Sequence, residues 1–217
     1  MNERSLISSG RTATMVQAKL APRPRAEDQT RWRILAVAAE CFAGHGYAAT
    51  SIRDIAREVG ITVGAIYVHF PSKDRLLVAV YEEGVRRIGE AVDGAIAGIA
   101  EPWARLAAGM RAHLEALLAN AGFARVIVRV IPTDVPEAAR DLRRLRDGYE
   151  ARFEAMIEAL DLAPDTDRTV LRLMLLGALN HTQTWYKRGA GRADAAGLAR
   201  QFVATLRHGV ARTGSSK

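Results

Sequence analysis

The 217-residue chain contains a single cysteine, Cys41. One cysteine cannot form a disulfide within the chain, which excludes a disulfide-stapled scaffold and favours a reducing compartment. The N-terminus has no apolar core of the kind found in signal peptides, and no apolar run approaches the roughly 20 residues that cross a bilayer. We therefore expect a cytoplasmic protein without a membrane partner.

The sequence also lacks the motifs of common catalytic and metal sites. Its five histidines show no metal-ligand spacing, and there is no H-E-x-x-H motif, phosphate-binding loop or nucleophile elbow. We expect no catalytic residue, no metal, no cofactor and no enzymatic activity. No stretch alternates apolar and polar residues for long enough to predict a strand, which leaves an all-α fold.

Positive charge is present in excess. The formal net charge is +7, which suits a polyanionic partner such as nucleic acid. Residues 1–27 hold five arginines and lysines, two prolines and no periodicity, and predict a disordered basic arm. This arm is either a solvated tail or a non-specific contact to phosphates, and the sequence leaves both open.

From residue 29 onward the apolar spacing is helical almost throughout. Ser51, with Asp54 three residues later, predicts a capped helix start, and Gly60 predicts its end in a left-handed turn. The helices are expected at residues 29–44, 52–59, 62–70, 73–99, 103–120, 122–131, 136–160, 166–188 and 194–211.

Residues 51–70 have the pattern of a helix-turn-helix, two short helices joined by a tight turn that contains glycine. In such a motif the second helix enters the DNA major groove. Gly64 stands inside that helix, where a glycine costs about 1 kcal/mol relative to alanine. Two reasons would justify it: close approach to DNA, or tight packing against a neighbouring helix.

Residues 33–81, "RILAVAAECFAGHGYAATSIRDIAREVGITVGAIYVHFPSKDRLLVAVY", resemble the N-terminal domain of the TetR family of bacterial transcriptional regulators. The motifs T-S-I-R-D-I-A-x-x-x-G and G-x-I-Y-x-H-F-x-x-K-x-x-L-L carry the resemblance. After the basic arm at 1–27, it implies a DNA-binding domain at 28–88 and an effector-binding and dimerisation domain at 89–217. It also implies a homodimer that binds a palindromic operator in double-stranded DNA and is released by a small-molecule effector.

The resemblance assigns roles to residues of the motif. The groove-facing positions are Thr62, Val63, Gly64 and Ala65. The positions that contact phosphates are Thr50, Ser51, Tyr67, His69 and Lys73, and Arg53 either reaches a phosphate or base or lies on a solvated helix face.

Residues 170–180, "VLRLMLLGALN", are apolar almost all round, so the helix must be covered on more than one side. Together with the last helix it predicts a four-helix bundle across a two-fold axis, and burial within one subunit is the alternative. The expected interface residues are Leu171, Met174, Leu175, Ala178, Leu198, Phe202 and Leu206.

Residues between the later helices are candidates for an effector pocket, although each alone is more typical of plain core. They are Trp103, Met110, His113, Leu117, Phe123, Ile127, Tyr149, Phe153 and Met156, together with the polar Asn180, Gln183 and Thr184. Polar groups on an apolar helix need partners, which a ligand, the other subunit or water could supply. Arg125 and Arg129 either meet an anionic headgroup or lie on a solvated face.

The stretch "LLGALNHTQTWYKRG" resembles TetR regulators of lipid and sterol catabolism that sense acyl-CoA thioesters. The expected effector is therefore small and largely apolar, with an acyl-CoA as one candidate. We expect a ligand-responsive transcriptional repressor. A transcriptional activator and an effector-independent DNA-binding protein are the alternatives.

Overall fold

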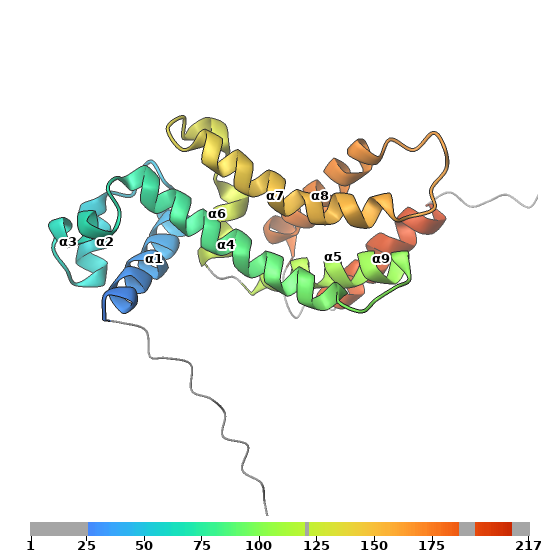
Figure 1. Cartoon of the computed structure of the whole chain (residues 1–217), viewed down its shortest axis with the longest axis horizontal. Helices are drawn as coiled ribbons and strands as arrows, with labels where there is room; N and C mark the ends of the chain where they lie inside the picture. Colours follow the sequence, from blue (N-terminus) through green and yellow to red (C-terminus); the bar gives the residue numbers. More distant parts are fainter. Residues whose placement is uncertain (1–25, 120–121, 187–193, 210–217) are drawn as a thin grey trace, which may run out of the picture.

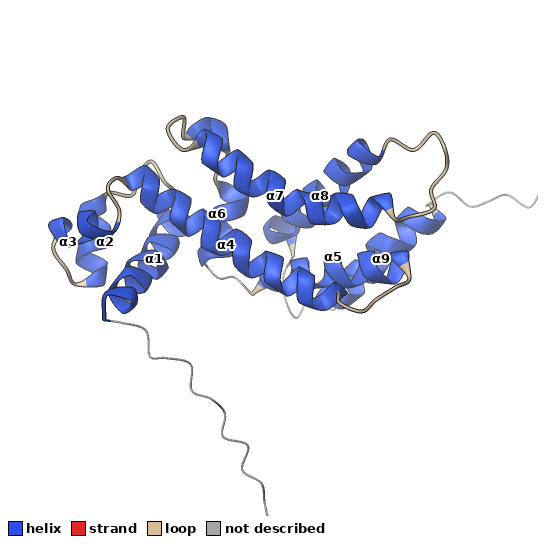
Figure 2. Cartoon of the chain, in the orientation of Figure 1, coloured by secondary structure: helices blue, strands red, loops and turns tan. Residues whose placement is uncertain are grey.

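The computed structural model describes residues 26–119, 122–186 and 194–209. The helices are α1 (Ala26–His45), α2 (Ile52–Val59), α3 (Val63–His69), α4 (Lys73–Ile96), α5 (Pro102–Leu118), α6 (Gly122–Arg129), α7 (Ala139–Glu158), α8 (Arg168–Trp185) and α9 (Ala195–His208), with a short 3-10 helix, η1 (Pro132–Asp134), ahead of α7. Within these described ranges there is no strand (Figure 2). The all-α prediction is confirmed.

The helices form an elongated molecule (Figure 1). Helices α1, α2 and α3 make one end, and α5, α8 and α9 lie toward the other. The long helix α4 runs from the first group to the second and packs against α1, α5, α6 and α7. Any displacement of α4 therefore reaches both ends of the molecule.

Local hydrogen bonds explain where α2 and α3 begin and end. The Ser51 hydroxyl accepts from the Asp54 N–H, while the Asp54 carboxylate accepts from the Ser51 N–H, a complete capping box. Gly60 ends α2 with φ 79°, a left-handed conformation that favours glycine. Thr62 caps α3 by accepting from the Ala65 N–H at 3.2 Å. The predicted capping pair and the glycine turn are confirmed.

Two hydrophobic cores share the length of α4. The first core joins α1, α2 and α3 to α4 as far as Tyr81, and it also takes Phe123 from α6 and Leu142 from α7. The second core begins on α4 at Ile88 and joins it to α5, α7, α8 and α9. The cores meet near the expected boundary at residue 88, but α6 and α7 contribute to both, so the two halves are packed together.

Several helix ends differ from the prediction. Helix α4 stops at Ile96, before the expected residue 99, because the chain turns at Gly98 with φ 74°. Helix α7 starts at Ala139, after the 3-10 turn η1, and not at Pro136. Helix α1 begins at Ala26, so the last two residues of the predicted arm are helical, and residues 1–25 lie outside the described chain.

Candidate DNA-binding surface and effector cavity

Helix α3 presents one inward and one outward side. Ile66 and the following Phe70 are buried in the first core, which anchors the helix. On the opposite side, the Tyr67 side chain is 47% exposed and that of Val68 is 78% exposed. Thr62 and Gly64 are also exposed. The outward side is thus narrow near its N-terminus and carries two large side chains further on.

The surroundings of Gly64 distinguish between the two reasons for an interior glycine. A Cβ built at this position would meet only the Thr62 hydroxyl, at 3.9 Å, and nothing from another helix. Packing within the described chain therefore does not require a glycine here. The remaining physical reason for a glycine at position 64 is close approach by an external partner.

Lys73 is held in place beside this surface. Its ammonium lies 4.2 Å from the centroid of the Tyr47 ring and donates to the Ala48 carbonyl at 3.5 Å. The Tyr47 hydroxyl in turn donates to the Asp74 carboxylate at 2.6 Å. Burial lowers the pKa of Lys73 below its usual value. These contacts fix a positive group at the start of α4, which reduces the entropy lost when it meets a phosphate.

The remaining predicted contact residues lie at the start of α2. Ser51 and Arg53 are exposed, and Arg53 makes no hydrogen bond or ion pair with the described residues. Thr50 departs from the predicted set because its side chain is buried. Its hydroxyl donates to the carbonyls of Cys41 and Gly46, at 3.2 and 2.7 Å. It therefore stabilises the end of α1 and leaves only its backbone for a phosphate.

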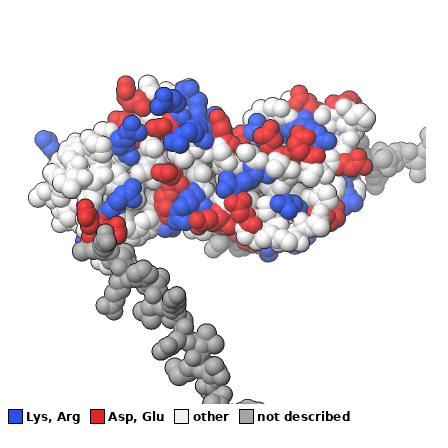
Figure 3. Space-filling model, in the orientation of Figure 1, with Lys and Arg blue, Asp and Glu red and all other residues white. Residues whose placement is uncertain are grey.

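Charge around α3 is sparse. Helix α3 contains no lysine or arginine, and Figure 3 shows few charged side chains over the α2–α3 end, while acidic and basic groups alternate elsewhere on this face. Arg53 and Lys73 flank the helix with positive charge. The helix itself offers shape, apolar contact and the hydrogen-bonding groups of Tyr67 and His69.

Helix α8 carries a second outward-facing surface. Val170, Leu173 and Met174 are each more than half exposed, and Gly177 continues the same face one turn later. We call these four residues the α8 stripe. An exposed apolar surface of this kind is a candidate interaction site.

The predicted interface residues divide between this surface and the core. Met174 belongs to the α8 stripe, whereas Leu175 is buried in the second core, so its assignment to the interface does not fit the structure. Leu171 and Ala178 are partly buried. Leu198, Phe202 and Leu206 on α9 also pack partly against the second core, because α9 lies along α5.

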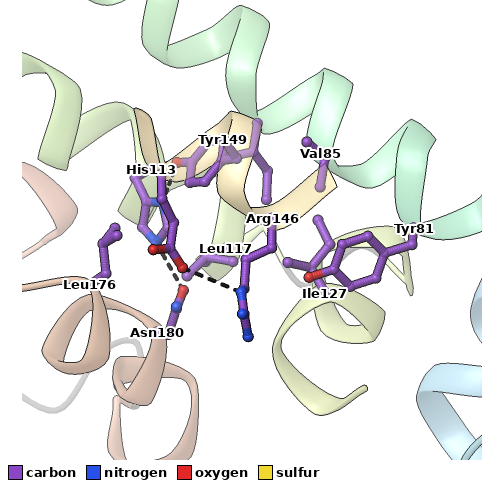
Figure 4. Close-up of a pocket in the computed structure, with 11 residues that line it drawn as sticks. Tyr81, Val85, His113, Leu117, Ile127, Arg146, Tyr149, Leu176 and Asn180 are labelled. Atoms are coloured by element: carbon purple, nitrogen blue, oxygen red, sulfur yellow. Dashed lines mark hydrogen bonds and ion pairs between the residues drawn. The ribbon is translucent and has the colours of Figure 1, made fainter. Parts of the chain in front are cut away.

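A cavity lies between α4, α5, α6, α7 and α8 (Figure 4). Its accessible volume is about 60 Å³, which is room for a few water molecules. Five predicted pocket residues line it: His113, Leu117, Ile127, Tyr149 and Asn180. Sequence reasoning missed six others: Tyr81, Val85, Ile88, Arg146, Glu150 and Leu176.

One hydrogen-bonded chain forms the polar wall of the cavity. His113 Nδ1 lies 2.5 Å from the Tyr149 hydroxyl, and His113 Nε2 lies 3.2 Å from Asn180 Oδ1. Full burial lowers the pKa of His113 to about 4, and burial raises the pKa of Tyr149 above its usual value. Both groups are therefore uncharged at neutral pH.

The other predicted pocket residues lie elsewhere. Met110, Phe153 and Met156 are buried in the second core, and Trp103 packs partly against it. Phe123 stacks on Trp32 of α1, with ring centroids 5.6 Å apart. Gln183 and Thr184 line a separate open groove. None of these seven lines the cavity.

Two family descriptions match the chain. Residues 34–80 match "Bacterial regulatory proteins, tetR family", and residues 100–210 match "Tetracyclin repressor-like, C-terminal domain". The chain belongs to the TetR family. No described helix of this TetR-family protein is long and apolar enough to cross a membrane.

Known proteins resemble the chain over most of its length. The fatty acid metabolism regulator protein of Bacillus subtilis is 21% identical over 182 residues, which are 82% of this chain and 94% of that protein. A tetR-family regulatory protein from Rhodococcus RHA1 has a TM-score of 0.70 at 26% identity, covering 86% of this chain and 99% of that one. The structure of AibR in complex with isovaleryl coenzyme A and operator DNA has a TM-score of 0.70 at 24% identity. The match covers 81% of this chain and 97% of the AibR chain. Other curated regulators match over 47–83 residues, only 16–36% of their own length.

In this TetR-family chain, α6 connects the cavity to the DNA-binding end. Glu40 of α1 accepts from the Gly122 N–H at 2.9 Å and pairs with Arg125. Arg129 donates to the Ala43 carbonyl, also on α1. Both arginines thus bind α1, an outcome different from the two that the sequence suggested. Because Ile127 of the same helix lines the cavity, a change there has a direct path to α1.

The buried His113 gives a pH-dependent stability. Its pKa is about 4 in the folded protein, against 6.5 for an ordinary histidine. The unfolded chain therefore takes up a proton first as pH falls below 6.5, and stability is lost between pH 6.5 and 4. From this group alone we expect the free energy of unfolding to fall by about 2 kcal/mol between pH 7 and pH 5.

Urea unfolding of the wild type and of His113→Gln at both pH values measures this effect. The variant keeps a polar side chain but has no group that titrates there, so its stability should change less over this interval. An equal change in the two proteins would contradict the assignment.

Proposed function

We propose that the protein is a ligand-responsive transcriptional repressor that binds a palindromic operator as a homodimer. In this proposal residues 28–88 form the DNA-binding domain and residues 89–217 the effector-binding and dimerisation domain. The protein acts by binding and not by catalysis. An activator would use the same surfaces, and nothing in the described structure favours it.

The DNA-binding part of the proposal rests on the outward side of α3. Gly64 has open space around it, so the N-terminal turn of α3 can approach base edges closely. Tyr67, His69 and Lys73 follow as donors to phosphate oxygens, which position the helix without reading sequence. The AibR structure, with its operator DNA, supports the same use of this fold.

The α8 stripe supports the homodimer. A stripe of three large apolar side chains and Gly177 is self-complementary across a two-fold axis, since the glycine allows two helices to approach closely. Two copies related in this way present two α3 helices to one face of a duplex. The operator is then expected to have two half-sites about one helical turn, 34–36 Å, apart.

The cavity supports a small and largely apolar effector. Val85, Ile88, Leu117, Ile127 and Leu176 supply its apolar surface. The present volume is too small for such a molecule, so binding must separate α6 and α4 from α5, α7 and α8. That separation moves the two helices that contact α1, which gives the effector a way to change the spacing of the α3 helices. AibR, whose structure holds isovaleryl coenzyme A, makes an acyl-CoA one candidate.

Selection of bound sequences from random duplex DNA, with the full-length protein, tests the DNA-binding proposal. We expect an inverted repeat whose affinity falls steeply as salt rises, because phosphate contacts release counterions. If the selection enriches no symmetric sequence, the proposed function is wrong.

Val68 and Lys73 should affect operator binding in different ways. The exposed apolar Val68 suits a thymine methyl group in the major groove, where a good base contact discriminates by about 1–3 kcal/mol. We expect Val68→Ala to relax the preference at one base pair of each half-site. Lys73→Ala should weaken binding to all DNA sequences alike. It should also reduce the salt dependence of the affinity by about one phosphate contact per subunit.

Binding assays on the selected operator and on single-base variants, at three salt concentrations, separate the two effects. A change of base preference in Lys73→Ala, or a uniform loss in Val68→Ala, would show that the two roles are wrongly assigned.

A further inference from the structure

The polar wall of the cavity has a defined direction of hydrogen bonding (Figure 4). A neutral imidazole has one donor and one acceptor nitrogen. Asn180 Oδ1 can only accept, so His113 Nε2 carries the proton and His113 Nδ1 accepts from the Tyr149 hydroxyl. The chain therefore runs from Tyr149 through His113 to Asn180, and it joins α7, α5 and α8.

Each end of this chain keeps unused hydrogen-bonding capacity. The Asn180 side-chain N–H groups have no hydrogen-bond partner among the described residues. The Tyr149 oxygen, which donates to His113, still has lone pairs that can accept. Both residues line the cavity. A molecule in the cavity thus meets a donor at Asn180 and an acceptor at Tyr149.

The charged groups at the cavity are already paired with one another. Arg146 Nε lies 3.6 Å from Glu150 Oε1 and 3.7 Å from Asp147 Oδ1. Glu150 also pairs with Arg172 of α8. The positive charges of Arg146 and Arg172 are offset by Glu150 and Asp147, and the Glu150 carboxylate in the lining would repel an anion.

We propose that the cavity selects effectors whose buried end is an uncharged carbonyl or hydroxyl on an apolar skeleton. Esters, thioesters, ketones and alcohols belong to this class, and free carboxylic acids and amines do not. A carbonyl oxygen accepts from the Asn180 N–H, and a hydroxyl can also donate to Tyr149. A carboxylate would lose its hydration without gaining an opposite charge. The inference depends on the proposal that this cavity is the effector site.

Three probes with the same apolar chain test this selectivity: octanoate, methyl octanoate and octan-1-ol. Calorimetric titration of the full-length protein at pH 7.5 measures each affinity, and operator affinity is measured separately with each probe. We expect the ester and the alcohol to bind at least tenfold more tightly than octanoate. Equal affinities, tighter binding of octanoate, or no binding of the ester and the alcohol would overturn the inference.

Variants at the wall locate the effect. Asn180→Leu should weaken binding of the ester about tenfold and reduce the protein's preference for the ester over octanoate. Asn180→Asp keeps an oxygen that accepts from His113 but replaces the N–H donors with a negatively charged carboxylate, so it should weaken binding of the ester and of octanoate together. The matched control Leu176→Ala removes an apolar contact, and should weaken all three probes while preserving their ratio. An unchanged preference for the ester over octanoate in Asn180→Leu would contradict the role of this side chain.

The two readouts separate this inference from the proposed function. If the ester binds with the expected selectivity but operator affinity stays the same, the cavity has the predicted specificity and the effector role is wrong. If octanoate binds best and releases the operator, the effector role stands and the selectivity is wrong.

Discussion

Met174→Glu should turn the protein into a monomer and weaken its binding to operator DNA by about 10²–10⁴-fold. Met174 is 56% exposed and lies at the centre of the α8 stripe. In a two-fold symmetric interface the substituted carboxylate enters from both subunits, so two like charges are brought together and desolvated. A monomer binds one half-site and loses the gain in effective concentration that links the second half-site to the first.

Ile131→Glu is the matched control for this substitution. Ile131 is 54% exposed, nearly the same fraction as Met174, but it lies between α6 and η1 and outside the α8 stripe. This variant should remain a dimer and keep its operator affinity. Light scattering gives the oligomeric state and a gel-shift assay gives the affinity. A dimeric Met174→Glu, or a monomeric one with undiminished operator affinity, would rule out the α8 stripe as the required interface.

Gly84→Ala should destabilise the protein, although alanine is the better helix former. A Cβ at Gly84 would lie 2.7 Å from Ile127 Cδ1 and 2.9 Å from the Phe123 carbonyl oxygen, so α6 would be pushed away from α4. Overpacking of this kind typically costs about 1–3 kcal/mol. Because Ile127 lines the cavity, the same displacement should also lower operator affinity in the absence of any effector.

Gly94→Ala, on the same helix, is the control. A Cβ at Gly94 has nothing within 4 Å, so the substitution should stabilise the protein by up to about 1 kcal/mol. Urea unfolding of both variants measures the opposite signs. A Gly84→Ala protein as stable as Gly94→Ala, with unchanged operator affinity, would show that the contact between α4 and α6 does not constrain the molecule.

Local sequence signals predicted the DNA-binding end well. The capping pair Ser51 and Asp54 and the left-handed Gly60 depend on residues within one or two turns of each other, so their pattern carries the structure directly. The exposed Val68 is absent from the predicted contact residues because it is apolar. Its position two residues from both Ile66 and Phe70, about 200° around the helix, was enough to place it opposite the core.

The cavity could be predicted only in part, because it depends on contacts between distant helices. The apolar spacing of α4 shows that Tyr81, Val85 and Ile88 face inward, but not whether another side chain or a cavity lies opposite them. Arg146 and Glu150 have the spacing of a solvated ion pair on a helix. Only the packing of α7 against α4 and α8 brings them to the cavity lining.

The interface prediction shows a similar limit. A helix that is apolar all round must be covered on several sides, but the pattern does not say which side meets the same subunit. In the structure Leu175 faces the core and Met174 faces outward, although they are adjacent in sequence.

The most direct test of the account is whether the cavity and the operator site are thermodynamically linked. The probe from the octyl series that binds most tightly is titrated into the full-length protein with and without operator DNA, and operator affinity is measured with and without the probe. If cavity binding changes the spacing of the α3 helices, operator DNA must weaken probe binding by the same factor by which the probe weakens operator binding, about 5–150-fold. Equal probe affinity with and without operator would contradict the account, however tightly the probe binds.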